Sequence, residues 1–267
     1  GQYYFLSRPR RFGKSLLLST LEAYFQGKKE LFEGLAMEKL EKDWKEYPIL
    51  HFDLNISQYD SPDSLYKILN DILSRYEDEY GTRPSEVTLP LRFAGIIDRA
   101  YRKTGQRAVI LIDEHDEEMQ NRFRNMLKPF YGVLKTMDRA IRFALLTGVT
   151  KFGKVSVFSD LNNLMDLSMD ERYVEICGIT EKDIHTYLED ELKELADTQD
   201  MTCEETSRKL KDRYDGYHFV ENSIGMYNPF SLLNTFARRK FGDYWFETGT
   251  PSYLVELLKH THYDLYE

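Results

Sequence analysis

The chain has 267 residues, of which 42% are hydrophobic, and it carries a formal net charge of −9. This length and composition suffice for a sizeable core, built as one large domain or two smaller ones. The acidic balance argues against non-specific nucleic-acid binding by the chain as a whole. The sequence lacks the run of about 18 apolar residues that a membrane span needs. Two cysteines without metal-ligand spacing favour a reduced, cytoplasmic protein.

A phosphate-binding motif stands at the start of the chain. An apolar, aromatic run at residues 3–7 predicts a strand, and a Gly-Lys-Ser sequence follows it at the start of a helix expected over residues 14–24. This order is typical of a P-loop, in which backbone N–H groups and a helix N-terminus converge on phosphate. We expect the triphosphate of a nucleotide to be bound by Arg10, Arg11, Phe12, Gly13, Lys14, Ser15 and Leu16.

Two residues of this loop have individual roles in the prediction. Lys14 should reach the β- and γ-phosphates, and Ser15 should bind Mg²⁺ through its hydroxyl. The motif is incomplete, however, because Arg8 stands where the pattern Gly-x-x-x-x-Gly-Lys-Ser has its first glycine. Glycine tolerates a positive φ, which an arginine adopts only at a cost. A second, independent element is therefore needed.

That element is the sequence AVILIDE at residues 108–114. Five consecutive apolar residues suit a strand that is buried on both faces of a parallel sheet. Ligands of open α/β sheets bind outside the carboxyl ends of the strands. We therefore expect Asp113 to bind Mg²⁺ and Glu114 to polarise the water that attacks the γ-phosphate.

Further elements alternate along the chain. Strands are predicted at residues 49–53, 141–147 and 173–177, and helices at 62–80, 91–104, 118–137, 181–196 and 203–214, with another beginning at Asn228. Pro129 predicts a kink or a break in its helix, and Thr180 should cap the helix that follows it. This alternation predicts an α/β fold, a parallel sheet of about five strands flanked by helices.

Thr147 ends the predicted strand at residues 141–147. In P-loop ATPases that have an extra strand between the P-loop strand and the acid strand, a polar side chain at this point senses the γ-phosphate. The alternative is a hydroxyl that satisfies the end of a strand. Arg213 has two interpretations as well: it could reach the phosphates from a lid, or it could be a surface arginine beside an acidic neighbour, which is the commoner case.

Seven segments together resemble a known family. They are FLSRPRRFGKSL (5–16), IDEHD (112–116), LTGVTKF (146–152), FSDLNNL (158–164), YDGYHF (214–219), YNPFS (227–231) and TGTPS (248–252). They are similar to the AAA-ATPase-like family found mostly in bacteria, whose usual P-loop carries the same arginine in place of the first glycine. His115 departs from the tyrosine expected there. The resemblance implies a Mg²⁺-dependent ATPase with Lys14, Glu114 and Thr147 as catalytic residues.

The resemblance also implies an organisation of the chain and a set of partners. It suggests an ATPase core over residues 1–178 and, within 179–267, a small helical lid and the start of a C-terminal region. A nuclease-like domain of the PD-(D/E)XK type often follows in this family, and a homo-oligomer could supply an arginine finger. Because Gly1 precedes the first strand directly, we expect the chain to be a fragment.

Three functions stay open at this point. The chain could be an active ATPase motor or loader. It could instead be a switch in which ATP occupancy controls an attached effector, or a degenerate P-loop used as a scaffold. Retention of Lys14, Ser15, Asp113 and Glu114 disfavours the scaffold.

Overall fold

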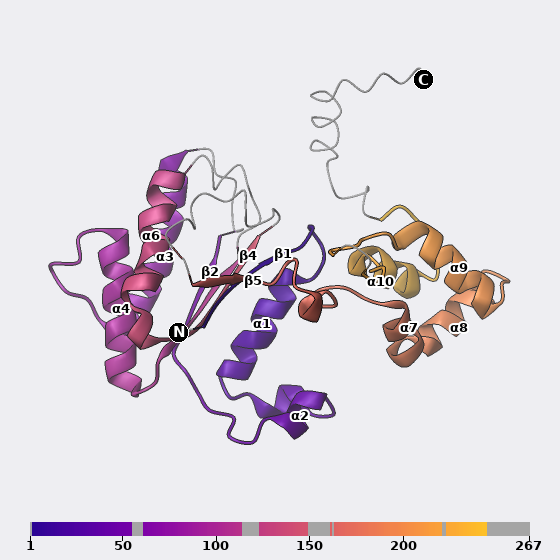
Figure 1. The fold of residues 1–267 in the computed structure, drawn as a ribbon, viewed down its shortest axis with the longest axis horizontal. Helices are drawn as coiled ribbons and strands as arrows, with labels where there is room; N and C mark the ends of the chain where they lie inside the picture. The colour runs from indigo at the N-terminus through magenta and orange to yellow at the C-terminus, as the bar shows by residue number, and fades with distance from the viewer. Residues whose placement is uncertain are drawn as a thin grey trace, which may run out of the picture. The chain divides into compact units, whose positions relative to one another are not determined.

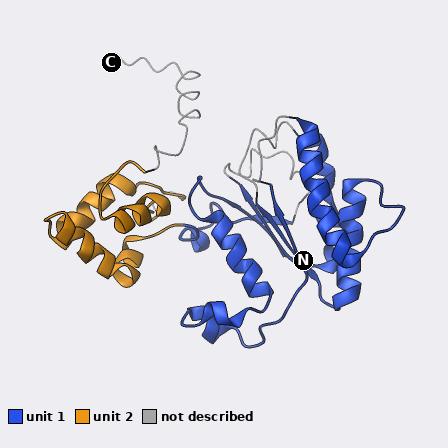
Figure 2. Cartoon of the chain, turned by 180° about the vertical axis from the view of Figure 1, so that it is seen from behind, with its two compact units in different colours: residues 1–177 blue, residues 178–267 orange. Residues whose placement is uncertain are grey.

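The computed structural model describes residues 2–54, 61–113, 123–148, 161, 163–220 and 223–244. The chain divides into two compact units, residues 1–177 and residues 178–267 (Figure 2). Each unit has its own hydrophobic core. Within the described ranges, no helix combines the length and the apolar character that a membrane crossing would need.

Unit 1 is built on a parallel sheet of five strands in the order β2-β3-β4-β1-β5 (Figure 1). The strands are β1 (Gln2–Ser7), β2 (Ile49–Asp53), β3 (Ala108–Asp113), β4 (Ile141–Gly148) and β5 (Leu164–Asp166). The predicted fold class is therefore confirmed. β4 lies between β1 and β3. β1 leads into residues 8–15, the predicted P-loop, which we call the phosphate loop, and β3 ends at Asp113.

Helices cover both faces of this sheet. They are α1 (Lys14–Phe25), α2 (Ala36–Leu40), α3 (Pro62–Tyr80), α4 (Leu89–Thr104) and α6 (Arg124–Thr136), with short 3₁₀ turns at Lys29–Phe32, Asp138–Ala140 and Glu171–Tyr173. α3, α4 and α6 lie over one face and α1 over the other (Figure 1). Ile110 and Ile112 of β3 face the layer of α3, α4 and α6, whereas Val109 and Leu111 face α1. Burial on both faces explains the uninterrupted apolar sequence of this strand.

Unit 2 is a helical cluster of α7 (Glu181–Tyr187), α8 (Glu189–Thr198), α9 (Cys203–Tyr214) and α10 (Pro229–Arg238). Its core contains Ile184, Leu192, Leu195, Leu210, Tyr214, Tyr227, Leu232 and Phe236. Thr180 caps α7 in a reciprocal capping box with Asp183, and the side chain of Asn228 caps α10. These local signals confirm the two predicted helix starts.

One predicted strand, at residues 173–177, is wrong. Residues 171–173 form a 3₁₀ turn and residues 174–177 form further turns. The carbonyls of Tyr173 and Ile176 accept hydrogen bonds from the Arg8 guanidinium instead of joining a ladder. The fifth strand is β5, at the edge of the sheet beside β1.

The single helix predicted at residues 181–196 is also wrong, because Leu188 leaves helical geometry (φ −126°, ψ 25°) and separates α7 from α8. Of the kink or break predicted at Pro129, the break is absent, because Pro129 lies inside α6, which continues to Thr136. The expected first part of that helix, residues 118–122, lies outside the described residues.

Candidate functional site

The carboxyl ends of four strands form one aligned edge. In the register of the sheet, Leu6 pairs with Thr147, Thr147 pairs with Asp113, and Asp113 pairs with Asp53. The phosphate loop begins directly after β1, so it starts from this same edge. Open parallel sheets bind their ligands at such an edge.

The predicted phosphate loop leads into the N-terminus of α1, which carries no side-chain cap. Gly13 is the N-cap of α1 and adopts φ +81°, a left-handed conformation that glycine adopts without strain. The first turn of this helix contains no acidic residue. A Cβ at Gly13 would meet open space, so the backbone is approachable. The N–H groups of the first turn and the helix dipole therefore suit a phosphate.

Lys14 is almost fully buried, with 2% of its surface exposed. Its Nζ donates hydrogen bonds to the carbonyl oxygens of Arg8 (2.8 Å) and Pro9 (3.1 Å). Burial lowers the pKa of Lys14 to about 8, while the nearby charge of Asp113 acts in the opposite direction. The ammonium group is thus held by backbone carbonyls in a place where its charge is poorly solvated.

Asp113 and Thr147 contact each other across β3 and β4. The Thr147 hydroxyl donates to Asp113 Oδ1 over 2.8 Å, and both residues are buried. Ser15 lies exposed in the first turn of α1. Hydroxyl and carboxylate oxygens fit Mg²⁺, which typically takes only one or two protein ligands and completes its shell with phosphate and water. The described residues contain no group of three or more His, Cys, Asp or Glu that could hold a metal ion.

The other predicted site residues differ in what they can offer. Arg10 is exposed, and Arg11 adopts a left-handed φ of 69°. Phe12 is buried, so only its backbone is available to a phosphate, and Leu16 is 70% exposed. Glu114 lies outside the described residues.

Arg8 has a role that the motif did not predict. It is not among the residues with positive φ, so an arginine replaces the first glycine without that strain. Its guanidinium is buried and donates to the backbone carbonyls of Ser7, at the end of β1, and of residues 168–176. Asp53, an exposed acid beside Asp113 in the register, was also not predicted, although an acid at the end of a predicted strand is a usable signal.

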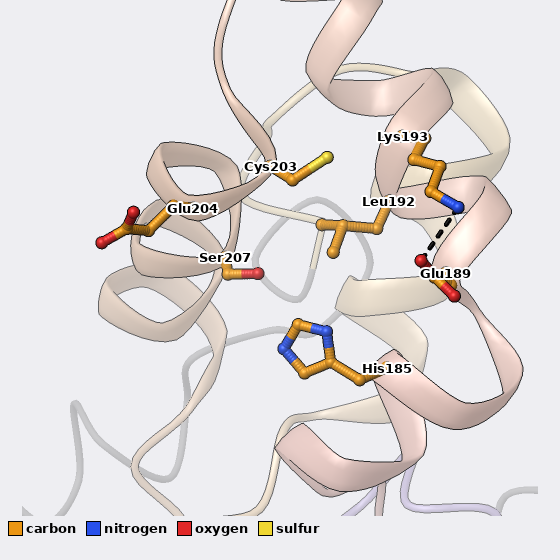
Figure 3. A pocket seen from close by; sticks show the side chains of 7 residues that line it. All are labelled: His185, Glu189, Leu192, Lys193, Cys203, Glu204 and Ser207. Atoms are coloured by element: carbon orange, nitrogen blue, oxygen red, sulfur yellow. Dashed lines mark ion pairs between the residues drawn. The ribbon is translucent and has the colours of Figure 1, made fainter.

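Unit 2 contains a separate hollow of about 300 Å³ between α7, α8 and α9 (Figure 3). His185, Glu189 and Cys203 line it, but Glu189 is paired with Lys193 at 2.9 Å, and the described residues form no metal-binding group here. Arg213 is partly exposed, and its Nη1 lies 3.9 Å from Asp243 Oδ1. This agrees with the interpretation of Arg213 as a surface arginine beside an acidic neighbour. We assign no part of the candidate site to these residues.

The chain is similar to a protein family and to a curated protein. A protein-family model described as "Predicted AAA-ATPase" matches residues 1–158. A curated relative from Azotobacter chroococcum mcd 1, described as an uncharacterized protein in the vnfD 5′ region, is 38% identical over 268 residues. The alignment covers 97% of this chain and 49% of the relative, so the chain spans about half the length of that protein.

Proposed function

This chain belongs to the AAA-ATPase-like family, and from that premise we propose that it binds Mg²⁺-ATP and hydrolyses the bond between the β- and γ-phosphates. One observation carries the proposal. The sheet order and register bring the phosphate loop, Asp113 and Thr147 to a single edge, with the Lys14 ammonium near enough to Asp113 for their charges to interact. Phosphoryl transfer needs this kind of positioned charge more than covalent chemistry.

Each residue has a distinct task in this proposal. The loop amides and Lys14 bind the phosphates, and Thr147 fixes the orientation of the Asp113 carboxylate through its hydrogen bond. Ser15 and Asp113 hold Mg²⁺, which when bound supplies charge neutralisation at the phosphate oxygens. Glu114 accepts a proton from water as the water oxygen bonds to the γ-phosphorus, while the β–γ bridging oxygen leaves with ADP.

We further propose that nucleotide turnover regulates an attached or partner effector, such as a nuclease-like domain, with unit 2 acting as a lid. About half of the curated relative lies outside the match, which leaves room for a further domain in that protein. Thermal unfolding with and without Mg²⁺-ATP tests binding, since a ligand of the folded state raises apparent stability. Steady-state phosphate release then tests turnover. Binding of Mg²⁺-ATP without release of phosphate would favour an occupancy switch. Absence of both binding and release would favour a degenerate P-loop that serves as a scaffold.

Thr147→Val should lower turnover about tenfold or more while leaving ATP affinity largely unchanged, because a hydrogen bond to a charged group is lost without a change in volume. If Thr147 acts through Asp113, the Mg²⁺ concentration for half-maximal turnover should rise as well. Phosphate release measured across a Mg²⁺ titration checks both effects. Thr147→Ser, which keeps the hydroxyl, is the matched control, and unchanged turnover in the valine variant would reject the role.

ATP affinity should fall as the pH rises above about 8. Burial lowers the pKa of Lys14 to about 8 in the free protein, and phosphate charges stabilise the ammonium in the complex. Above pH 8 binding must therefore take up a proton, which weakens it by up to about tenfold per pH unit. Titration of a fluorescent ATP analogue between pH 7 and 9.5 measures this dependence.

The control for this pH dependence is Lys14→Arg, because a guanidinium keeps its charge throughout this range. Its affinity should be lower than that of the wild type and should not change with pH. A wild-type affinity that is constant from pH 7 to 9.5 would contradict the assignment of Lys14 to the phosphates.

A further inference from the structure

Arg8 links the phosphate loop to a distant part of the chain. Its side chain is 1% exposed. Nε donates to the carbonyl of Ile176 (3.0 Å), and Nη2 donates to that of Tyr173 (2.9 Å). Nη1 donates to the carbonyls of Ser7 (2.9 Å) and Ser168 (3.1 Å). We call residues 168–177 the connector, because this segment ends where unit 2 begins at Gly178.

The connector is also held to β1 by other groups. The backbone N–H of Ser7 donates to Ser168 Oγ at 2.7 Å, and the N–H of Ser168 donates to Asp166 Oδ1 at 2.8 Å. Burial lowers the pKa of Arg8 to about 10, with Cys177 and Asp166 acting against that shift. Arg8 therefore stays charged at neutral pH and keeps all of its donors.

The same residue is engaged on its backbone side by the phosphate-binding lysine. The Arg8 carbonyl accepts a hydrogen bond from Lys14 Nζ at 2.8 Å. A bound triphosphate competes for that ammonium group, because the lysine of a P-loop reaches the β- and γ-phosphates. When Lys14 turns to the phosphates, the Arg8 carbonyl loses this donor. The two ends of one residue thus contact the nucleotide-sensitive lysine and the connector.

We propose that Arg8 is a positioning residue that couples nucleotide occupancy of the phosphate loop to the conformation of the connector. This inference rests on the proposed nucleotide binding. The planar guanidinium suits the role because it holds several carbonyls in a fixed fork, which a lysine cannot do. If Arg8 only fastens the connector in place, the connector does not respond to nucleotide.

Hydrogen–deuterium exchange of the whole chain tests the coupling. Peptides that cover residues 168–177 are followed with and without saturating Mg²⁺-ADP, whose binding is confirmed separately with a fluorescent analogue. We expect the exchange rate in the connector to change by about fivefold or more, the lower end of typical coupling factors. A wild-type protein that binds nucleotide without changing connector exchange overturns the inference without any variant. A protein that binds no nucleotide refutes the proposed function instead.

Two variants then identify the residue responsible. Arg8→Lys keeps a positive charge and should bind Mg²⁺-ADP while the connector no longer responds. Arg92→Lys is the matched control, since Arg92 is another largely buried arginine of unit 1 and pairs with Glu77 at 2.7 Å between α3 and α4. The control should keep the wild-type response. A response of Arg8→Lys equal to that of the wild type overturns the role of Arg8. Should Arg8→Lys fail to fold, the wild-type comparison alone still decides whether the connector is coupled.

Discussion

Replacing Lys14 with methionine should weaken Mg²⁺-ATP binding by about 10- to 100-fold, the value of one charge-assisted hydrogen bond, while the free protein stays folded. The loss of affinity follows from removing the ammonium that binds the phosphates. The small effect on folding follows from burial. The Lys14 ammonium is desolvated in the free protein, and its two hydrogen bonds to carbonyls offset only part of that cost.

Two measurements separate these effects. A fluorescent ATP analogue measures affinity, and thermal unfolding without ligand measures stability. Lys67→Met, at an exposed lysine of α3, is the control and should change neither. An ATP affinity of Lys14→Met equal to that of the wild type would contradict the assignment of Lys14 to the phosphates. A fall of more than about 10 °C in the unfolding midpoint, which corresponds to several kcal/mol in a chain of this size, would contradict the account of burial.

The central strands could be predicted from the sequence because each carries its own signal. β3 and β4 are almost continuous apolar runs, as strands covered on both faces must be. β5 has three residues and joins only β1, so it leaves too short a pattern to detect. Residues 173–177 have a strand-like composition, yet Arg8 takes two of their carbonyls. That competition depends on a residue far away in the chain.

Helical periodicity has a similar limit in unit 2. Ile184 of α7 and Leu192 and Leu195 of α8 all face one core, so the apolar pattern continues across the break at Leu188. Periodicity reports which side is buried and does not detect a single non-helical residue. The helix starts at Thr180 and Asn228 were predictable because a capping side chain bonds to backbone only three residues away.

The candidate site, too, could be predicted from the sequence only in part. The meeting of Asp113 with Thr147 follows from the strand order, and the sequence predicted both residues at strand ends. The burial of Lys14 against the carbonyls of Arg8 and Pro9 is a property of the folded loop, which the motif alone does not specify. The same holds for Arg8, whose position in the pattern suggested only a missing glycine.

Glu114→Gln should lower ATP turnover by about 100- to 10,000-fold, the usual contribution of a general base, and leave ATP affinity within about threefold of the wild type, since binding depends on the loop, Lys14 and Asp113. Glutamine has nearly the shape of glutamate but cannot accept a proton from water. Phosphate release at saturating Mg²⁺-ATP measures turnover, and the fluorescent analogue measures affinity. Glu117→Gln changes another acid, three residues further along the chain, and should keep activity.

This experiment also distinguishes an enzyme from a switch. In an ATPase, the wild type turns over many times faster than Glu114→Gln, and both bind ATP. In an occupancy switch, the wild type already releases phosphate so slowly that the substitution changes little, and the response must be sought in the effector. Equal and rapid turnover in the two proteins would remove Glu114 from the mechanism. The general base would then have to be another acid at this edge of the sheet. Asp53 at the end of β2, the register neighbour of Asp113, is the next residue to replace.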